Sequence, residues 1–179
     1  MLQFESSPWD ARISRPGPDT AVRLRPARQD DWPALTRLLA AMSVSSTGLR
    51  AHLATTFVLE RGHPRTDDGH LLGCVAVEPG PTALVRSLAV TVEGQARGYD
   101  GLLLNLALKL AARTGAADVV LLVETAAQVP AFRLESVEWA DLRTSCSGSA
   151  LVRELSAFDS MALAVRMPLP GPSRAREIQ

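Results

Sequence analysis

The sequence predicts a mixed α/β sheet with helices on both faces, and three observations support this fold class. Segments in which apolar and polar residues alternate, as in strands, are followed along the chain by segments in which apolar residues recur with helical periodicity. An apolar strand, a glycine-rich turn and a long apolar helix follow one another between Ser87 and Leu104. The chain has 179 residues, of which 46% are hydrophobic, so a single domain can bury its own core.

The first half of the chain is expected to form three strands and two helices. Acidic residues and Pro33 mark a helix start, after which apolar residues recur on one helical face. The Asp68-Gly69 pair predicts a hairpin turn within the link 61–70. The predicted elements are a strand over 21–25, a helix from about Asp30 to Met42, a short helix over 47–53, and strands over 56–60 and 71–78.

The second half continues the alternation after a turn at Pro79-Gly80-Pro81. The predicted elements are a strand over 83–90, a helix over 101–113 that Gly115 ends, a strand over 119–123, a partly helical region over 128–156 and a strand over 161–167. Residues 1–20 are expected to form a flexible N-terminal arm and residues 168–179 a flexible C-terminal tail. The folded domain is therefore predicted to cover residues 21–167.

Charge and cysteine content exclude several classes of function. The 19 basic and 19 acidic residues balance, so nothing favours nucleic-acid binding. The longest apolar runs, 102–112 and 119–123, are too short to cross a bilayer, and the first residues lack the features of a signal peptide. Two distant cysteines, Cys74 and Cys146, form neither a disulfide framework nor a zinc pattern. We therefore expect a cytoplasmic protein, and its arginine-, alanine- and leucine-rich composition indicates a GC-rich, bacterial-type genome.

The remaining histidine and cysteine positions do not predict a metal site or a nucleophile. The spacing of His63 and His70 matches no common metal site, so we interpret both as turn residues. His52 is interpreted as a helix-surface histidine, with a place in a substrate pocket as the alternative. Cys146 lies in a small polar segment with no histidine after it, which favours a loop over a catalytic thiol.

The order of the predicted elements, with its glycine turn before the third helix, resembles that of the GNAT acetyltransferase superfamily over residues 21–167. The superfamily's turn has the pattern R/Q-x-x-G-x-G/A, and Gln95, Gly98 and Asp100 occupy those positions here. The preceding Leu88-Ala89-Val90 is similar to the superfamily's "LAV" strand. A closer resemblance is to amino-acid N-acetyltransferases of the arsenic-resistance type, the arsinothricin acetyltransferase-like proteins. The fragments that carry it are 46–53, 73–78, 84–90 and 125–127.

The resemblance implies a single-domain fold with a mixed, mostly antiparallel sheet flanked by helices, and acetyl-CoA as co-substrate. It implies that the turn's amides hold the pyrophosphate and that the strand before it faces the pantetheine arm and the acetyl carbonyl. The residues concerned are Leu88, Ala89, Val90, Gln95, Ala96, Arg97, Gly98, Tyr99, Asp100 and Gly101. It further implies that Arg86 binds the carboxylate of an amino-acid substrate. The partner is a small-molecule amine, and a homodimer is left open.

Two departures from the superfamily's pattern concern function. Asp100 stands where a small residue is expected, and a carboxylate about 5 Å from a phosphate charge costs about 3 kcal/mol at an effective dielectric of about 20. An outward-turned side chain screened by Arg97 removes much of this cost.

The aromatic-x-x-Leu-Gly-Phe segment that the superfamily has after the fifth strand is also absent, and with it the tyrosine that usually serves as the acid. The only tyrosine is Tyr99, inside the glycine turn.

Several single residues have two interpretations. Leu88-Ala89-Val90 is either plain core or a source of amides that polarise the thioester carbonyl. Arg86 either lies buried against a carboxylate or points from the strand to solvent. Glu78 and Glu124 end strands, where α/β sheets place ligands, so either can deprotonate an amine through water. Taken singly, each of these glutamates is more simply a surface carboxylate. Asp100 alone is an acid in the first turn of a helix.

The leading hypothesis is an N-acetyltransferase that moves an acetyl group from acetyl-CoA to the amine of a small molecule, such as an amino acid or its analogue. The alternative is a non-catalytic protein of the same fold that senses an acyl-CoA or serves as a partner subunit. A third hypothesis is a structural domain with no cofactor. The two departures favour these rivals.

Overall fold

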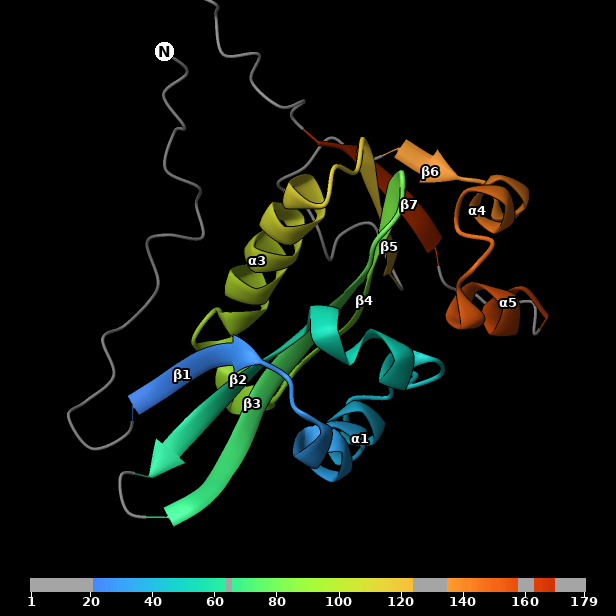
Figure 1. Ribbon diagram of the computed structural model, residues 1–179. Helices are drawn as coiled ribbons and strands as arrows, with labels where there is room; N and C mark the ends of the chain where they lie inside the picture. Colours follow the sequence, from blue (N-terminus) through green and yellow to red (C-terminus); the bar gives the residue numbers. More distant parts are fainter. Residues whose placement is uncertain (1–20, 64–65, 124–134, 158–162, 170–179) are drawn as a thin grey trace, which may run out of the picture. The chain divides into compact units, whose positions relative to one another are not determined.

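Figure 1 shows the structure, a computed structural model that describes residues 21–63, 66–123, 135–157 and 163–169. Its strands are β1 (Ala21–Pro26), β2 (Thr56–His63), β3 (Thr66–Glu78), β4 (Thr82–Val90), β5 (Asp118–Val123), β6 (Glu135–Val137) and β7 (Leu163–Pro168). Its α-helices are α1 (Trp32–Ala41), α2 (Val92–Ala96), α3 (Tyr99–Arg113), α4 (Trp139–Ser145) and α5 (Ala150–Ala157). Two 3-10 helices, η2 (Gln29–Asp31) and η3 (Leu49–Thr55), flank α1 in the sequence.

The strands form one seven-stranded sheet in the order β1-β2-β3-β4-β5-β7-β6. Strands β4 and β5 are parallel, whereas β1–β2, β2–β3, β5–β7 and β6–β7 are antiparallel. The parallel pair requires a crossover, and α3 supplies it. This architecture confirms the predicted α/β class with a mostly antiparallel sheet flanked by helices.

The chain divides into two compact units, and strands β3 and β4 each pass through both. The first unit comprises Met1–Ala76 and Ser87–Leu106, and the second comprises Val77–Arg86 and Ala107–Gln179. In the first unit, leucines of α1 and η3 pack on one face of the sheet against apolar residues of β2, β3 and β4. The members of this core include Leu35, Leu39, Leu53, Val58, Cys74 and Ala89.

The opposite face of the first unit meets α3 at Gly73. A Cβ there would lie 2.8 Å from Leu103 Cδ1 and 3.1 Å from the Ala89 carbonyl oxygen. Successive residues of a strand point to opposite faces, so Cys74 reaches the α1 side while Gly73 lets α3 approach the backbone. The first unit therefore has helices on both faces of its strands.

The second unit has a core of its own. Leu84 of β4, Val120 of β5 and Ala164 of β7 pack against Leu142 of α4 and Val152 of α5. All five side chains are buried. Helices α4 and α5 thus share one core with three neighbouring strands, β4, β5 and β7. No helix in the described residues is long and apolar enough to cross a membrane.

Most predicted elements of the described residues are present, with ends shifted by a few residues. The hairpin predicted within the link 61–70 is confirmed, because β2 and β3 pair antiparallel as far as His63 and Thr66. The position of its turn at Asp68-Gly69 is wrong, because β3 begins at Thr66 and both residues lie inside it. Arg61 pairs with His70 and His63 with Thr66, so His63 and His70 are strand residues rather than turn residues. Cross-strand pairing here prevails over the local turn preference of Asp-Gly. The predicted arm 1–20 and the tail from residue 170 lie outside the described residues.

Substitution of Gly73 by alanine is expected to lower the free energy of unfolding by about 1–3 kcal/mol, because the added methyl group overpacks the α3 contact. Denaturation in urea measures the change. Gly148→Ala is the matched control, since a Cβ there would meet nothing within 4 Å. It is expected to change stability by less than about 0.5 kcal/mol. Equal stabilities of the two variants would contradict the close approach of α3.

Candidate functional site

The glycine turn between β4 and α3 contains the short helix α2, which contacts the end of β4 and the middle of β3. The Thr91 amide donates to the Leu72 carbonyl over 2.9 Å, and the Thr91 hydroxyl accepts from the Gly94 amide over 3.2 Å. A Cβ on Gly94 would lie 2.6 Å from Val90 Cγ1. Only glycine therefore lets α2 lie this close to β4. Gln95 also binds α2 to β4, because its Nε2 donates a hydrogen bond to the Val90 carbonyl over 3.2 Å.

The start of α3 presents backbone amides. Gly98 connects α2 to α3 with a left-handed φ of 73°, and a Cβ there would meet nothing within 4 Å. The Leu102 amide makes the first bond into the helix, donating to the Gly98 carbonyl over 3.3 Å. The amides of Tyr99, Asp100 and Gly101 precede it, and the first amides of a helix have no partner within the helix. This geometry suits a phosphate group.

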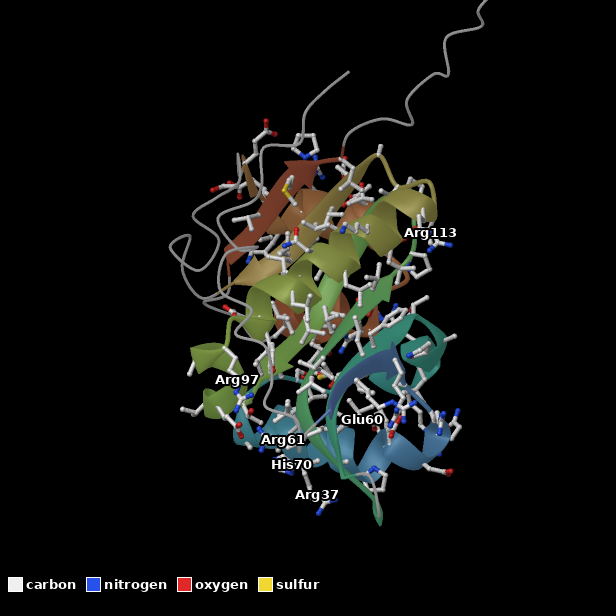
Figure 2. All side chains as sticks on the ribbon, turned by 90° about the vertical axis from the view of Figure 1, so that its left-hand side faces the viewer. Arg37, Glu60, Arg61, His70, Arg97 and Arg113 are labelled. Atoms are coloured by element: carbon white, nitrogen blue, oxygen red, sulfur yellow. The ribbon has the colours of Figure 1, made fainter. Side chains whose placement is uncertain are left out.

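Charged side chains surround the turn. Asp100 is half-buried in the first turn of α3, and the Tyr99 side chain is buried. Arg97 pairs with Glu93 over 3.0 Å, and Arg61 of β2 pairs with the same carboxylate. Figure 2 shows Arg61 and Arg97 close to one another. The hydrogen bond from Arg61 holds the pKa of Glu93 below its ordinary value. Arg97 is thus engaged by Glu93, in contrast to its expected role of screening Asp100.

Strand β4 leaves regular strand geometry at Ser87, whose φ of 53° lies in the left-handed region. The contacts of this residue include two hydrogen bonds. The Cys74 thiol donates to the Ser87 carbonyl over 3.3 Å, and the Ser87 hydroxyl donates to the Ser45 carbonyl over 3.5 Å. Burial raises the pKa of Cys74 to about 12, so the thiol stays protonated and keeps its hydrogen for this bond at neutral pH.

The pairing of β4 with β5 ends just before this bend. The register runs from Thr82↔Asp118 to Val85↔Leu121. Strand β4 continues for five residues to Val90, whereas Leu122 and Val123 pair with β7. A bend at this point changes the direction of the backbone amides that follow it, those of Leu88, Ala89 and Val90.

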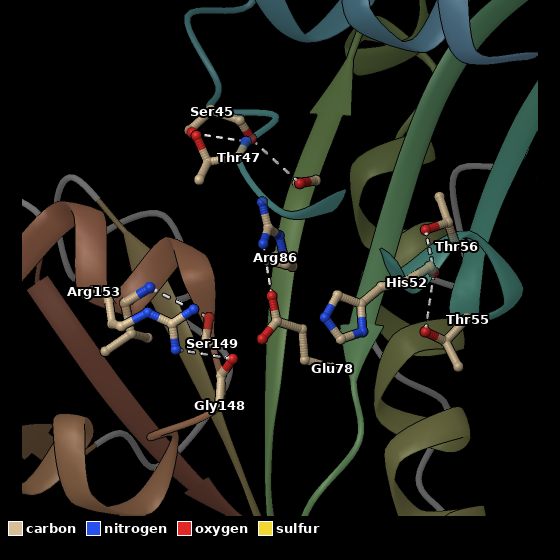
Figure 3. Close-up of polar contacts among 12 residues, drawn as sticks. Ser45, Thr47, His52, Thr55, Thr56, Glu78, Arg86, Gly148, Ser149 and Arg153 are labelled. Atoms are coloured by element: carbon tan, nitrogen blue, oxygen red, sulfur yellow. Dashed lines mark hydrogen bonds and ion pairs between the residues drawn. The ribbon is translucent and has the colours of Figure 1, made fainter. Parts of the chain in front are cut away.

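Arg86 and Glu78 form a buried ion pair in the second unit. Arg86 Nη1 lies 2.6 Å from Glu78 Oε1 (Figure 3). The Arg86 side chain is 0% exposed and the Glu78 side chain 8%. Arg86 is therefore buried, so its interpretation as a solvent-facing residue is wrong, and the carboxylate beside it belongs to the protein. The simpler interpretation of Glu78 as a surface carboxylate is also wrong. Glu78 ends β3 and Arg86 lies in β4, and the turn Pro79–Pro81 between these strands returns the chain so that the two charges meet.

The other residues singled out in the sequence have structural roles or lie elsewhere. His52 is half-buried within η3, where its carbonyl accepts from the hydroxyls of Thr55 and Thr56 (Figure 3). Cys146 ends α4 as a buried free thiol, and burial, with Glu78 adding to it, raises its pKa. Glu124 lies outside the described residues. Among the described residues no group of three or more acidic, histidine or cysteine side chains could hold a metal ion.

Sequence reasoning missed two features of the site. Helix α2 carried a recognisable signal, because Thr91 is a good N-cap and Glu93 an acid in the first turn. The left-handed residue in β4 carried none, since serine gives no indication of a positive φ.

Comparison of the sequence with protein-family models and with curated proteins gives no match. The structure is similar to N-acetylglutamate synthase from Neisseria gonorrhoeae complexed with coenzyme A and N-acetyl-glutamate, with a TM-score of 0.65 and 19% identity. The match covers 84% of this chain and 35% of that one, so this chain spans about a third of that protein's length.

Two further structures match over most of their own length. An acetyltransferase of the GNAT family from Staphylococcus aureus Mu50 has a TM-score of 0.62 and 8% identity, over 84% of this chain and 100% of that one. The GNAT-family N-acetyltransferase YhbS from Escherichia coli, in complex with CoA, has a TM-score of 0.55 and 18% identity, over 88% and 85%. The chain therefore has the fold of the GNAT acetyltransferases.

Replacement of Ser87 tests the left-handed bend. Ser87→Gly is expected to stay within about 1 kcal/mol of the wild type, because glycine adopts this conformation freely but loses more freedom on folding. Ser87→Val is expected to lose about 1–3 kcal/mol through backbone strain. Denaturation in urea measures both changes, with Ser136→Val, at an exposed strand position, as the control. A valine variant as stable as the glycine variant would contradict a left-handed Ser87.

Proposed function

We propose that the protein is an acetyl-CoA-dependent N-acetyltransferase of the GNAT superfamily, acting on the amine of a small molecule. One observation carries the proposal: a bent strand, an open left-handed Gly98 and the first amides of a long helix follow one another in a chain with the GNAT fold. Acyl transfer to an amine needs a bound thioester, a polarised carbonyl and an uncharged nucleophile.

The turn fits the phosphates of a coenzyme. The amides of Tyr99, Asp100 and Gly101 would hold the pyrophosphate, and the absence of a side chain at Gly98 leaves room for it. Gln95, Ala96 and Arg97 would border the same group. Acetyl-CoA supplies the activated acetyl group when bound, and structures of this fold crystallised with CoA support this choice.

Strand β4 fits the thioester end of the coenzyme. Beyond the bend at Ser87, the backbone of Leu88, Ala89 and Val90 would hold the pantetheine arm and direct an amide at the acetyl oxygen, where negative charge develops. Preorganisation matters here because the Cys74 and Ser45 contacts fix the bend before any ligand binds. Placement of the two reactants supplies much of the rate enhancement of such a transfer.

The acceptor has to lose a proton before it attacks. Glu78 is the described carboxylate that we assign to this step, acting directly or through one water, and Glu124 would serve the same role if Glu78 does not. The departing thiolate would take its proton from water or from the amine. An amino-acid acceptor has support from the neighbour crystallised with N-acetyl-glutamate. A cytoplasmic location and a homodimer stay predictions.

Two measurements test the proposed function. Calorimetric titration with acetyl-CoA is expected to show saturable binding, and release of free thiol is expected when a panel of small amines is added. No heat at millimolar acetyl-CoA would overturn the enzyme and the acyl-CoA sensor together. Binding without turnover of any amine would leave the non-catalytic alternative.

Asp100→Asn is expected to tighten acetyl-CoA binding by up to roughly a hundredfold, because it removes a negative charge beside the phosphate site. Calorimetry at low salt measures the dissociation constant, and added salt should shrink the effect. Asp141→Asn, an exposed acid in the first turn of α4, is the control. An unchanged dissociation constant at low salt would show that the Asp100 carboxylate does not act on the phosphates.

A further inference from the structure

We infer that Arg61, Arg97 and His70 form a binding site for a phosphate monoester beside the glycine turn, and that the Glu93 carboxylate competes with this ligand for the two arginines. The monoester that the proposed function supplies is the phosphate on the ribose 3′ oxygen of coenzyme A, so this choice of ligand rests on the proposed function. The site is separate from the pyrophosphate site, because it consists of side chains of β2, β3 and the end of α2 rather than of the first amides of α3.

Two guanidinium groups from different elements meet one carboxylate oxygen. Arg61 lies on β2 and Arg97 ends α2, and Nη2 of each pairs with Oε1 of Glu93. His70 of β3 lies opposite Arg61 in the antiparallel register, so its exposed side chain shares this face of the sheet. The three basic side chains are labelled in Figure 2. All four residues belong to the first unit.

Hydrogen-bond donors outnumber acceptors in this cluster. Each guanidinium group carries five N–H donors, whereas the ion pairs of both arginines end on a single oxygen of Glu93. Arg61 Nε is buried and has no hydrogen-bond partner in the described part of the chain. Two guanidinium charges also meet one carboxylate charge. A phosphate monoester has three acceptor oxygens and a charge of about −2 at neutral pH, so it matches the cluster better than one carboxylate does.

Glu93 can be displaced from the arginines at low cost. Its side chain is 44% exposed, and those of Arg61 and Arg97 are 26% and 36% exposed. Ion pairs at such exposure contribute little to stability. The hydrogen bond from Arg61, followed by the charges of Arg97 and His70, lowers the pKa of Glu93, so the carboxylate is ionised at neutral pH and competes as an anion.

The cluster adjoins the turn that fits the pyrophosphate. Arg97 directly precedes Gly98, and Glu93 lies in the first turn of the helix that Arg97 ends. Coenzyme A carries its pyrophosphate and its 3′-phosphate on the 5′ and 3′ oxygens of one ribose. A coenzyme whose pyrophosphate lies on the amides of α3 therefore brings a phosphate monoester to the same neighbourhood. Recognition at this cluster selects acetyl-CoA against its 3′-dephospho form.

Calorimetry on the full chain with acetyl-CoA and with acetyl-3′-dephospho-CoA tests the choice of ligand. At low salt the wild type is expected to bind acetyl-CoA about tenfold or more tightly than the dephospho form, because only the monoester replaces Glu93 at the arginines. Arg61→Gln is expected to bring the two dissociation constants within about threefold of one another, by loss of affinity for acetyl-CoA. Arg37→Gln, at an exposed position of α1, is the matched control and should keep the wild-type ratio.

Glu93→Gln gives a readout of the opposite sign. Removal of the competing charge is expected to raise the preference for acetyl-CoA over its dephospho form about threefold or more. Such a gain cannot come from damage to the fold, so it stays decisive if Arg61→Gln fails to fold. Asp30→Asn, at an exposed position of η2, is the control for loss of a negative charge and should leave the ratio unchanged.

Titration with inorganic phosphate distinguishes the coenzyme from a free phosphate as the ligand. The turn's amides also suit phosphate, so only binding that weakens in Arg61→Gln and tightens in Glu93→Gln identifies the cluster. Equal binding of the two coenzyme forms, together with such phosphate binding, supports the site and overturns the choice of coenzyme. If neither titration depends on Arg61 and Glu93, the inference is overturned and the acetyltransferase proposal is untouched. Failure of acetyl-CoA to bind overturns the proposed function, and the phosphate titration then decides the anion site alone.

Discussion

The left-handed backbone of Ser87 is the constraint on which the candidate site depends. A regular strand would alternate its residues without interruption from Thr82 to Val90, but a residue with φ of 53° changes the direction of everything after it. The Ser45 carbonyl accepts from the Ser87 hydroxyl, and the buried Cys74 thiol donates to the Ser87 carbonyl. Strained backbone persists where its surroundings over-determine it, and such residues concentrate at functional sites.

The buried ion pair of Arg86 and Glu78 contributes little to the stability of the fold. Burial of two charges costs desolvation energy that their attraction only partly offsets, so such a pair is weak evidence for stability. Apolar residues of similar volume would serve a purely structural purpose equally well. The structure shows this pair directly before the left-handed residue of β4, with Arg86 fully buried and Glu78 nearly so.

Local patterns predicted the elements, and long-range pairing decided their limits. The strand over 83–90 and the helix that follows it were visible because apolar periodicity is a property of neighbouring residues. The Asp-Gly turn failed because β2 and β3 pair as far as His63 and Thr66, and no local preference records the partner strand. Likewise, Arg86 in the sequence is equally consistent with solvent and with a carboxylate. Only the folded structure, in which the chain returns after Glu78, brings the two residues together.

By itself the sequence determined the α/β class, the order of most strands and helices up to β5, and the position of the glycine turn. These features depend on periodicity and on residues such as Gly98 that mark turns. The tertiary structure decided the left-handed Ser87, the packing of α2 against Val90 and Leu72, and the pairing of Arg86 with Glu78. These features arise from contacts between residues distant along the chain. Their energies depend on burial and on the direction of side chains, which no local pattern contains.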